Sequence, residues 1–406
     1  MPKLLQINST ANWGSTGKIA EQIGELAMAH GWESYIAYGR SSNKSKSHLI
    51  RIGSKVGQAW HLIISRLFDK HGLGSRYATK RLIREIEVIK PDIIHLHNIH
   101  GYYINYKLLF EYLNSTDTPI VWTLHDCWAF TGHCAHFVEA GCDKWQYECG
   151  NCCNIKTYPK SKTDNSMYNF HLKQRLFTSL KNRLNIITVS KWLESETTKS
   201  FFKNTRINHL YNGVDSNIFK PTYSNNLKLK YSIDEKFLIV SIASIWDENK
   251  GLNDLIRLSS ILTDKYVIMI IGRKTEQVLQ TYPNIISIPR TDSQLELAEI
   301  YSQANAVIST SRQETFGLTL AEGMACGTPA IAYNNTALPE LITNSTGAIV
   351  EHGDIDGLAQ AIKTICNNGK DYYRDACREH ALKHFDKTTC FEKYIELYNE
   401  LLVKKL

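Results

Sequence analysis

The stretch Ser311–Pro329 reads SRQETFGLTLAEGMACGTP and determines how the second half of the chain folds. An apolar run just before it, residues 306–309, predicts a short buried strand, and the apolar spacing after Phe316 predicts a helix. Gly327 ends that helix and Pro329 prevents it from continuing. Such a strand–loop–helix unit is the repeating unit of a parallel α/β sheet, in which ligands bind where the strands end.

Two carboxylates in this stretch, Glu314 and Glu322, are separated by seven residues. Glu314 is expected on the loop at the strand's end, and Glu322 about two turns along the helix. The first backbone N–H groups of a helix have no partner inside it and attract anions. We therefore expect the amides of Gly317, Leu318 and Thr319 to face a phosphate, beside acids that bind hydroxyl groups of the same ligand.

Apolar runs followed by polar turns recur along the chain and predict an α/β fold with two Rossmann-like halves. The expected strands cover residues 3–7, 34–38, 92–96, 120–124, 185–189, 237–242, 267–271, 285–288, 306–309 and 329–333. We divide the chain into an N-terminal domain, 1–208, a C-terminal domain, 209–385, and a closing helix, 386–406, expected to pack on the N-terminal domain. Two such domains are expected to face each other across a ligand-binding cleft.

Polar residues follow the expected strands of the first half. A loop is expected at residues 8–18 and a helix from Ile19 onward. Gly14 in that loop lets the backbone approach a ligand closely. His125 directly follows a buried-type strand and is the preferred functional histidine. Both His125 and His97 have an alternative role as hydrogen-bonded residues of the core.

The charge of the 406-residue chain is uneven: its net +7 divides into +11 over residues 1–210 and −4 over residues 211–406. Between Arg51 and Lys90, basic residues alternate with apolar and aromatic ones such as Trp60. This pattern suits an anionic membrane surface, although an ordinary solvated helix shares it. No apolar run approaches the ~20 residues that span a bilayer, and no signal peptide is recognised. We expect a cytoplasmic protein, peripheral at the inner face of the plasma membrane.

Six of the ten cysteines fall between Cys127 and Cys153. Without a secretory signal, a disulfide framework is not expected. A long segment with little regular structure needs a cross-link, and four thiolates in one segment are typical of a structural zinc site. The expected ligands are Cys134, Cys142, Cys149 and Cys152, with His133 or His136 as a replacement for one of them. A set of buried free thiols is the alternative.

Several motifs resemble those of family 4 glycosyltransferases: NGVDSNIFKP at 212–221, KGL at 250–252, the two glutamates with FGLTL between them, and ACGTP at 325–329. The first half, with TLHDCWAFTGHC and the cysteine-rich insert 127–153, resembles a branch that builds bacterial surface polysaccharides such as colanic acid, capsule and the O-antigen of lipopolysaccharide. The resemblance extends across nearly the whole chain and implies the GT-B fold.

The resemblance also implies the reaction and its partners. A nucleotide-sugar donor, UDP- or GDP-linked, would bind the C-terminal domain, and a glycan or lipid-linked oligosaccharide acceptor the N-terminal domain. The sugar would be transferred with retention of configuration, and no metal or other cofactor would take part in catalysis. The identities of the sugar and the acceptor stay open.

Residue roles follow from the same resemblance. Glu314 would bind sugar hydroxyls near the reacting carbon and Glu322 the ribose. Lys250 would neutralise the diphosphate as it leaves. The remaining donor contacts would come from His125, from Gly14 and from the amides of Phe316, Gly317, Leu318 and Thr319.

One position departs from the family pattern. The family usually carries an arginine five residues before the lysine, and this chain has Ile245 there. Lys250 is therefore expected to act with another cation, Arg273, or with backbone amides alone.

Two other enzyme classes and one binding module are alternatives to the transferase. A nucleotide-sugar epimerase or a phosphorylase shares the two-domain architecture, and a phosphorylase needs a lysine for pyridoxal phosphate. A glycosyl hydrolase does not need a phosphate-binding helix. A zinc-containing nucleic-acid-binding module is disfavoured because the basic residues lie far in sequence from the cysteines; no nucleic-acid partner is expected.

Overall fold

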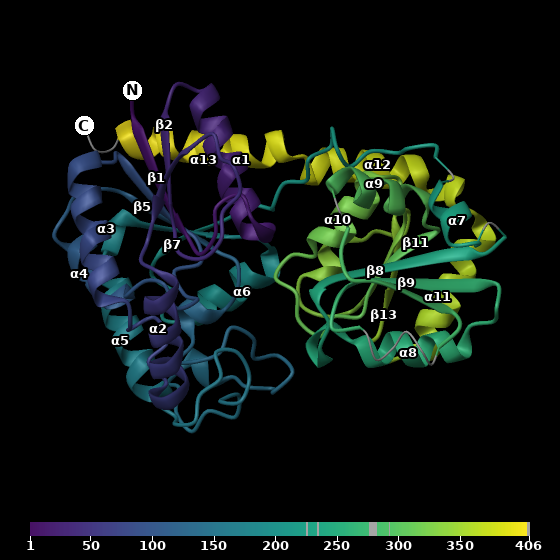
Figure 1. Cartoon of the computed structure of the whole chain (residues 1–406), viewed down its shortest axis with the longest axis horizontal. Helices are drawn as coiled ribbons and strands as arrows, with labels where there is room; N and C mark the ends of the chain where they lie inside the picture. The colour runs from purple at the N-terminus through teal and green to yellow at the C-terminus, as the bar shows by residue number, and fades with distance from the viewer. Residues whose placement is uncertain (225, 234, 276–281, 292, 404–406) are drawn as a thin grey trace. The chain divides into compact units, whose positions relative to one another are not determined.

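The computed structural model describes residues 1–224, 226–233, 235–275, 282–291 and 293–403. The chain divides into two compact units (Figure 1). Unit 1 comprises Met1–Tyr211 together with Cys390–Leu406, and unit 2 comprises Asn212–Thr389. Each unit is built on one parallel β-sheet flanked by helices.

The sheet of unit 1 has the order β3-β2-β1-β4-β5-β6-β7, and all its strand pairs are parallel. Its central strands are apolar on both faces, as expected of a parallel sheet covered by helices. The strands are β1 (Lys3–Asn8), β2 (Glu33–Tyr38), β3 (His48–Arg51), β4 (Ile93–Leu96), β5 (Ile120–Leu124), β6 (Leu184–Thr188) and β7 (Arg206–His209).

The helices of unit 1 connect these strands, and a long segment of mostly irregular structure separates β5 from α5. Only two short 3₁₀ turns, Trp128–Phe130 and Lys144–Gln146, are described between those elements. The helices are α1 (Gly14–Ala29), α2 (Lys55–Phe68), α3 (Arg76–Ile89), α4 (Tyr106–Asn114), α5 (Ser166–Thr178) and α6 (Lys191–Lys199).

The last helix, α13 (Lys387–Val403), completes the core of unit 1. Its buried face packs with residues of β1, α1, β4 and β5. Tyr398 hydrogen-bonds through its hydroxyl to Nδ1 of His95 at 2.6 Å, and Tyr394 to the hydroxyl of Thr123 at 3.1 Å. Both tyrosines are buried, so the helix is attached by an apolar face that also satisfies polar groups of the sheet.

The sheet of unit 2 has the order β10-β9-β8-β11-β12-β13 and is also parallel throughout. Its strands are β8 (Phe237–Ile245), β9 (Tyr266–Arg273), β10 (Ile285–Ile288), β11 (Ala306–Ser309), β12 (Ala330–Tyr333) and β13 (Gly347–Val350). Its helices are α7 (Asn226–Lys230), α8 (Leu252–Ile261), α9 (Gln294–Gln303), α10 (Leu318–Ala325), α11 (Ile355–Asn368) and α12 (Lys370–Phe385).

The two parallel sheets and all ten expected strands are present, but four details differ from the sequence prediction. Helix α1 begins at Gly14, not at Ile19. The backbone N–H of Asn12 donates a hydrogen bond to the carbonyl of Gly17, which closes the first turn although no side chain caps it. Strands β3, β7 and β13 were not expected. Each lies at a sheet edge and is largely solvent-accessible, so none has the continuous apolar run of a buried strand.

The hydroxyl of Tyr398 provides a test of how α13 is held. Tyr398→Phe should lower the free energy of unfolding of unit 1 by about 1–3 kcal/mol, because a buried nitrogen of His95 loses its partner. Urea unfolding followed by tryptophan fluorescence reports on this unit, since seven of the eight tryptophans lie in it. Glu400→Gln on the same helix breaks a half-exposed pair with Arg206 and should change stability little. Equal effects of the two changes would contradict the prediction.

Candidate functional site

Lys250 and Glu314 meet at the C-terminal edge of the unit 2 sheet. The Nζ of Lys250 forms an ion pair with Oε1 of Glu314, and roughly a quarter to a third of each side chain remains exposed. The backbone of Glu314 is fixed by Thr336, whose hydroxyl accepts from its N–H at 3.0 Å and donates to its carbonyl at 2.8 Å. The structure thus brings together two residues that are 64 positions apart in the chain.

The turn that carries Lys250 is held against the end of β11. Thr310 donates from its hydroxyl to the carbonyls of Lys250 and Gly251, at 3.1 Å each. Gly251 has φ +71°, and a Cβ there would lie 2.2 Å from the carbonyl oxygen of Thr310. Only glycine fits this close approach. Gly251 therefore allows the preceding residue, Lys250, to lie beside the end of β11.

Helix α10 begins immediately after Glu314. Its N-cap, Gly317, has φ +103°, and a Cβ there would lie 2.8 Å from Leu338. Within the described part of the chain, no side chain caps this helix. Its first amides, including those of Leu318 and Thr319, are therefore suited to an anionic ligand. Phe316, by contrast, is buried with its ring against Phe385, so its side chain serves packing.

Glu322 lies further along α10, where its Oε2 accepts a hydrogen bond from the hydroxyl of Tyr301 at 3.2 Å. Burial and the nearby charge of Glu322 raise the pKa of Tyr301 well above its ordinary value. The tyrosine therefore stays protonated and orients the carboxylate. Gly323, next in the helix, packs against Val307 of β11, where a Cβ would approach to 2.6 Å; this contact fixes the height of Glu322 above the sheet.

Arg273 lies beside the position of the missing arginine. Ile245 and Arg273 are register partners at the ends of the adjacent strands β8 and β9, and paired residues of neighbouring strands point to the same face. The Arg273 side chain is exposed, and Ile245 is 38% exposed. Arg273 on β9 thus supplies a cation next to the position on β8 where the family usually has an arginine.

In unit 1, His125 belongs to a chain of hydrogen bonds. Gln6 donates from its amide nitrogen to the carbonyl of Ala20 at 2.7 Å, so its oxygen accepts from Nε2 of His97 at 3.0 Å. Nδ1 of His97 must then accept from Nε2 of His125, at 3.1 Å. Burial lowers the pKa of His125 to about 4, so the imidazole is neutral at physiological pH. His97 has both ring nitrogens bonded and is buried, as the core interpretation requires.

Asp126 and His100 form a further polar pair that the sequence analysis did not assign. Nε2 of His100 lies 2.8 Å from Oδ2 of Asp126, and the N–H of Trp128 donates to Oδ1 at 2.9 Å. Burial raises the pKa of Asp126, but His100 and this N–H outweigh it and bring the pKa to about 2. The only sequence signal was the position of Asp126 just after a strand.

Gly14 is the first residue of α1, not a loop residue as expected. It has φ +65°, is exposed, and has no atom near the position of a Cβ. The space beside its backbone is therefore open to a ligand.

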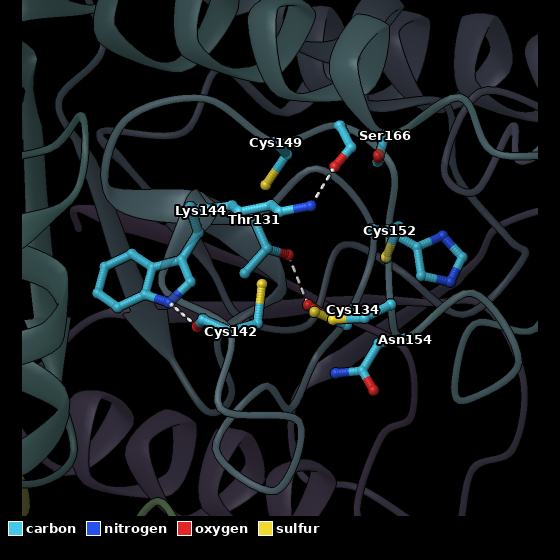
Figure 2. A pocket seen from close by; sticks show the side chains of 12 residues that line it. Thr131, Cys134, Cys142, Lys144, Cys149, Cys152, Asn154 and Ser166 are labelled. Atoms are coloured by element: carbon cyan, nitrogen blue, oxygen red, sulfur yellow. Dashed lines mark hydrogen bonds between the residues drawn. The ribbon is translucent and has the colours of Figure 1, made fainter.

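Cys134, Cys142, Cys149 and Cys152 line one small cavity in unit 1, and Figure 2 shows their sulfur atoms around it. All four are free thiols. Burial raises the pKa of Cys134, Cys149 and Cys152 to about 12. Among the described residues, no three His, Cys, Asp or Glu side chains are already placed to hold a metal ion together.

A curated relative and two solved structures match most or all of the chain. The putative colanic acid biosynthesis glycosyl transferase WcaC of Escherichia coli is 24% identical over 89% of this chain and 90% of its own length. Sucrose-phosphate synthase from Thermosynechococcus elongatus superposes over 100% of both chains with a TM-score of 0.74 at 18% identity. Anabaena HepE, solved in complex with UDP, covers 98% of this chain and 100% of its own, with a TM-score of 0.68 at 15% identity.

These likenesses show that the two parallel-sheet units form the GT-B fold. Two family models account for most of the sequence: Glycosyltransferase Family 4 matches residues 19–217, and Glycosyl transferases group 1 matches residues 225–384. The chain therefore belongs to the family 4 glycosyltransferases.

Proposed function

We propose that the protein is a retaining glycosyltransferase that moves a sugar from a UDP- or GDP-linked donor to a hydroxyl group of a growing, lipid-linked bacterial surface polysaccharide. The observation that carries this proposal is the convergence of Lys250, Glu314 and the start of α10 at one sheet edge. A cation and helix amides suit the diphosphate, and a carboxylate suits sugar hydroxyls. HepE, a structural neighbour, was solved with UDP.

The chemistry requires stabilisation of a leaving anion. The bond between the sugar's anomeric carbon and the phosphate oxygen breaks, and its electron pair stays on the diphosphate. Lys250, Arg273 and the amides of Leu318 and Thr319 would stabilise that charge, which is largest in the transition state. The acceptor oxygen attacks the same face of the sugar, and its proton passes to the departing phosphate oxygen. This route retains configuration and needs no metal ion.

The ion pair between Lys250 and Glu314 would be exchanged when the donor binds. Without a ligand the two charges neutralise each other. With the donor in place, the ammonium group has a diphosphate to bind and the carboxylate has sugar hydroxyls. Each charge is then satisfied by a different part of one ligand, so Glu314 acts on the sugar and not as a proton-transfer base.

Helix α2 supports a membrane-bound acceptor because its apolar residues face outward. Val56, Trp60, Ile63 and Leu67 recur at helical spacing and are 81%, 63%, 46% and 38% exposed. Its buried face is polar instead. His61 is fully buried, and its Nε2 accepts hydrogen bonds from the backbone N–H groups of Gly72 and Gly74 at 3.2 and 3.1 Å.

Exposed basic residues lie on α2, on α3 and at the ends of β3 and α2, namely Arg51, Lys55, Arg66, Lys70, Arg76, Lys80, Arg81 and Arg84. An outward apolar stripe within a basic surface matches the interface of an anionic bilayer. None of the helices in the described ranges is long and apolar enough to cross a membrane. We infer that α2 rests on the inner face of the plasma membrane, next to the lipid-linked acceptor.

Glu314 tests the assignment of the sugar site. Glu314→Gln should lower the turnover of the donor by about 10²–10³-fold, because a contact that strengthens in the transition state is lost. Nucleotide release from UDP- and GDP-sugars, with lipid extract as acceptor, measures this. Glu235→Gln, at the opposite edge of the same sheet just before β8, should behave as the unchanged enzyme. Turnover of Glu314→Gln near the original rate would remove Glu314 from the mechanism.

Glu322→Ala provides the contrasting variant in this experiment. It should weaken binding of the free nucleoside diphosphate about tenfold, whereas Glu314→Gln should leave that affinity nearly unchanged. Calorimetric titration with UDP and GDP separates the two roles, and identical losses in both variants would argue against them.

Arg273 tests the replacement of the missing phosphate contact. Arg273→Ala should weaken nucleoside diphosphate binding by about 10- to 100-fold, because a charge-assisted hydrogen bond is lost. Adding Ile245→Arg to that variant should restore much of the affinity, since the two positions are paired across adjacent strands. Lys265→Ala, just before the opposite end of β9, serves as the control. An Arg273→Ala variant with unchanged affinity would leave the backbone amides as the remaining phosphate contacts.

The outward stripe of α2 tests membrane contact. Trp60→Ser with Ile63→Ser should reduce binding to phosphatidylglycerol-containing vesicles at least tenfold, because about 1.5–3 kcal/mol is lost for each apolar side chain. Binding should also fall as salt is raised. Tyr372→Ser, which removes a 72% exposed aromatic residue from unit 2, should have no effect in vesicle co-sedimentation. Equal binding of both variants would contradict the role of α2.

A further inference from the structure

The segment between β5 and α5 is built around aromatic side chains and thiols, and no part of the proposed transfer reaction uses it. Phe130, Phe137 and Trp145 are buried and pack against one another, with ring centroids 4.7–6.3 Å apart. Apart from two short 3₁₀ turns, the described chain here forms no helix or strand. Such a segment has few backbone hydrogen bonds of its own, so a cross-link would contribute much to its order.

The thiol cavity has the size and the lining of a site for a single ion. Its volume is about 20 Å³, which is close to the space that one water molecule occupies. Four sulfur atoms from well-separated positions of the segment face it, as Figure 2 shows. Cys153 also lines the cavity but is exposed, so the four less exposed thiols supply the donor number and the chemistry of a closed structural zinc site.

Backbone amides already donate to three of these sulfurs. The N–H of Gly132 lies 3.2 Å from the Sγ of Cys149. Backbone hydrogen bonds also reach Cys142 from Lys144, and Cys152 from Asn154. In the last two cases the amide belongs to the second residue after the cysteine. N–H groups directed at sulfur stabilise the thiolate, which is the form that binds metal.

A buried histidine in the cavity wall points independently to an occupant. Nδ1 of His133 lies 2.6 Å from Oδ1 of Asp69, and both side chains are almost completely buried. Nε2 of His133 has no hydrogen-bond partner among the described residues, although its residue lines the cavity. His133 is therefore held by Asp69 with its second nitrogen in the cavity wall, beside the thiols. A buried nitrogen left without a partner would otherwise be costly.

A buried lysine beside the cavity is suited to neighbouring negative charge. Lys173 is buried, donates to the carbonyls of Trp128 and Thr131 at 2.7 and 3.0 Å, and lies 3.5 Å from the ring centre of Trp128. Burial lowers the pKa of Lys173 to about 7, and the carboxylates of Asp69 and Asp126 oppose this shift. Thiolates at Cys134 and Cys149 would add further opposite charge around this ammonium group.

We propose that the insert binds one structural zinc ion through the thiolates of Cys134, Cys142, Cys149 and Cys152, with His133 and Lys173 around the sulfur shell. Binding converts four thiols and Zn²⁺ into a zinc tetrathiolate and releases four protons to solvent. As placed, no three of the described side chains are at the spacing of a formed site, so the thiols move inward as the ion binds. The proposal is independent of the transfer reaction.

Metal analysis of the full-length chain tests this site. The protein, purified under reducing conditions and dialysed, should contain one zinc ion per chain. Cys149→Ser should lose the ion, whereas Cys153→Ser, which changes the exposed neighbouring thiol, should keep it. Protein that contains no zinc and takes none up on addition of Zn²⁺, or equal loss in both variants, would overturn the proposal. Air-free mass analysis that finds these cysteines paired in disulfides would overturn it as well.

Cobalt substitution keeps the test valid if Cys149→Ser does not fold. The chain without any amino-acid change, once stripped of metal, should bind one Co²⁺ and show the visible absorption bands of a tetrahedral site. Its sulfur-to-metal charge-transfer band should have the intensity expected for four thiolate ligands. Lowering the pH should weaken binding, because protons compete for the thiolates. Cys142→Ser should lose the cobalt spectrum and His133→Asn should keep it. The reverse pattern would overturn this ligand set, and the absence of a tetrahedral spectrum would overturn the site.

Discussion

Every strand pair in both sheets is parallel, and this constraint places the functional groups. In a parallel sheet the strands end at one edge, so residues far apart in sequence meet there. Lys250 follows β8, Arg273 ends β9 and Glu314 follows β11. In unit 1, His125 follows β5 in the same way. The fold thus gathers polar and charged side chains at one edge of each sheet, and the helices supply packing and amides.

This constraint explains which features could be predicted from sequence. Buried strands such as β5 and β11 show as continuous apolar runs, so their ends, and with them His125 and Glu314, could be located to the residue. Edge strands such as β13 have solvent-accessible residues and gave no such signal. The pairing of Ile245 with Arg273 could not be derived either, because register depends on how two strands align in space and not on either strand's own pattern.

The contacts of Glu314 and Glu322 support the proposal that the opening motif is a ligand site and not a pair of acids for proton transfer. One of the two glutamates already has a cationic partner, and the other accepts from a buried tyrosine. In both arrangements the carboxylate oxygens act as acceptors. Two carboxylate acceptors on either side of a helix start fit a ligand with hydroxyl groups at both ends and phosphate between them.

The cysteine-rich segment shows how stability and function are separated in unit 1. Asp126 is bonded to His100, and Asp69 to His133, so each carboxylate holds one imidazole. The first pair lies directly after the strand that carries His125, and the second lies in the wall of the thiol cavity. Between them lies Lys173 of α5, which donates to the carbonyls of Trp128 and Thr131 at 2.7 and 3.0 Å. The turn that follows His125 and Asp126 is therefore held to α5 by a buried side chain, and this contact belongs to the packing of unit 1.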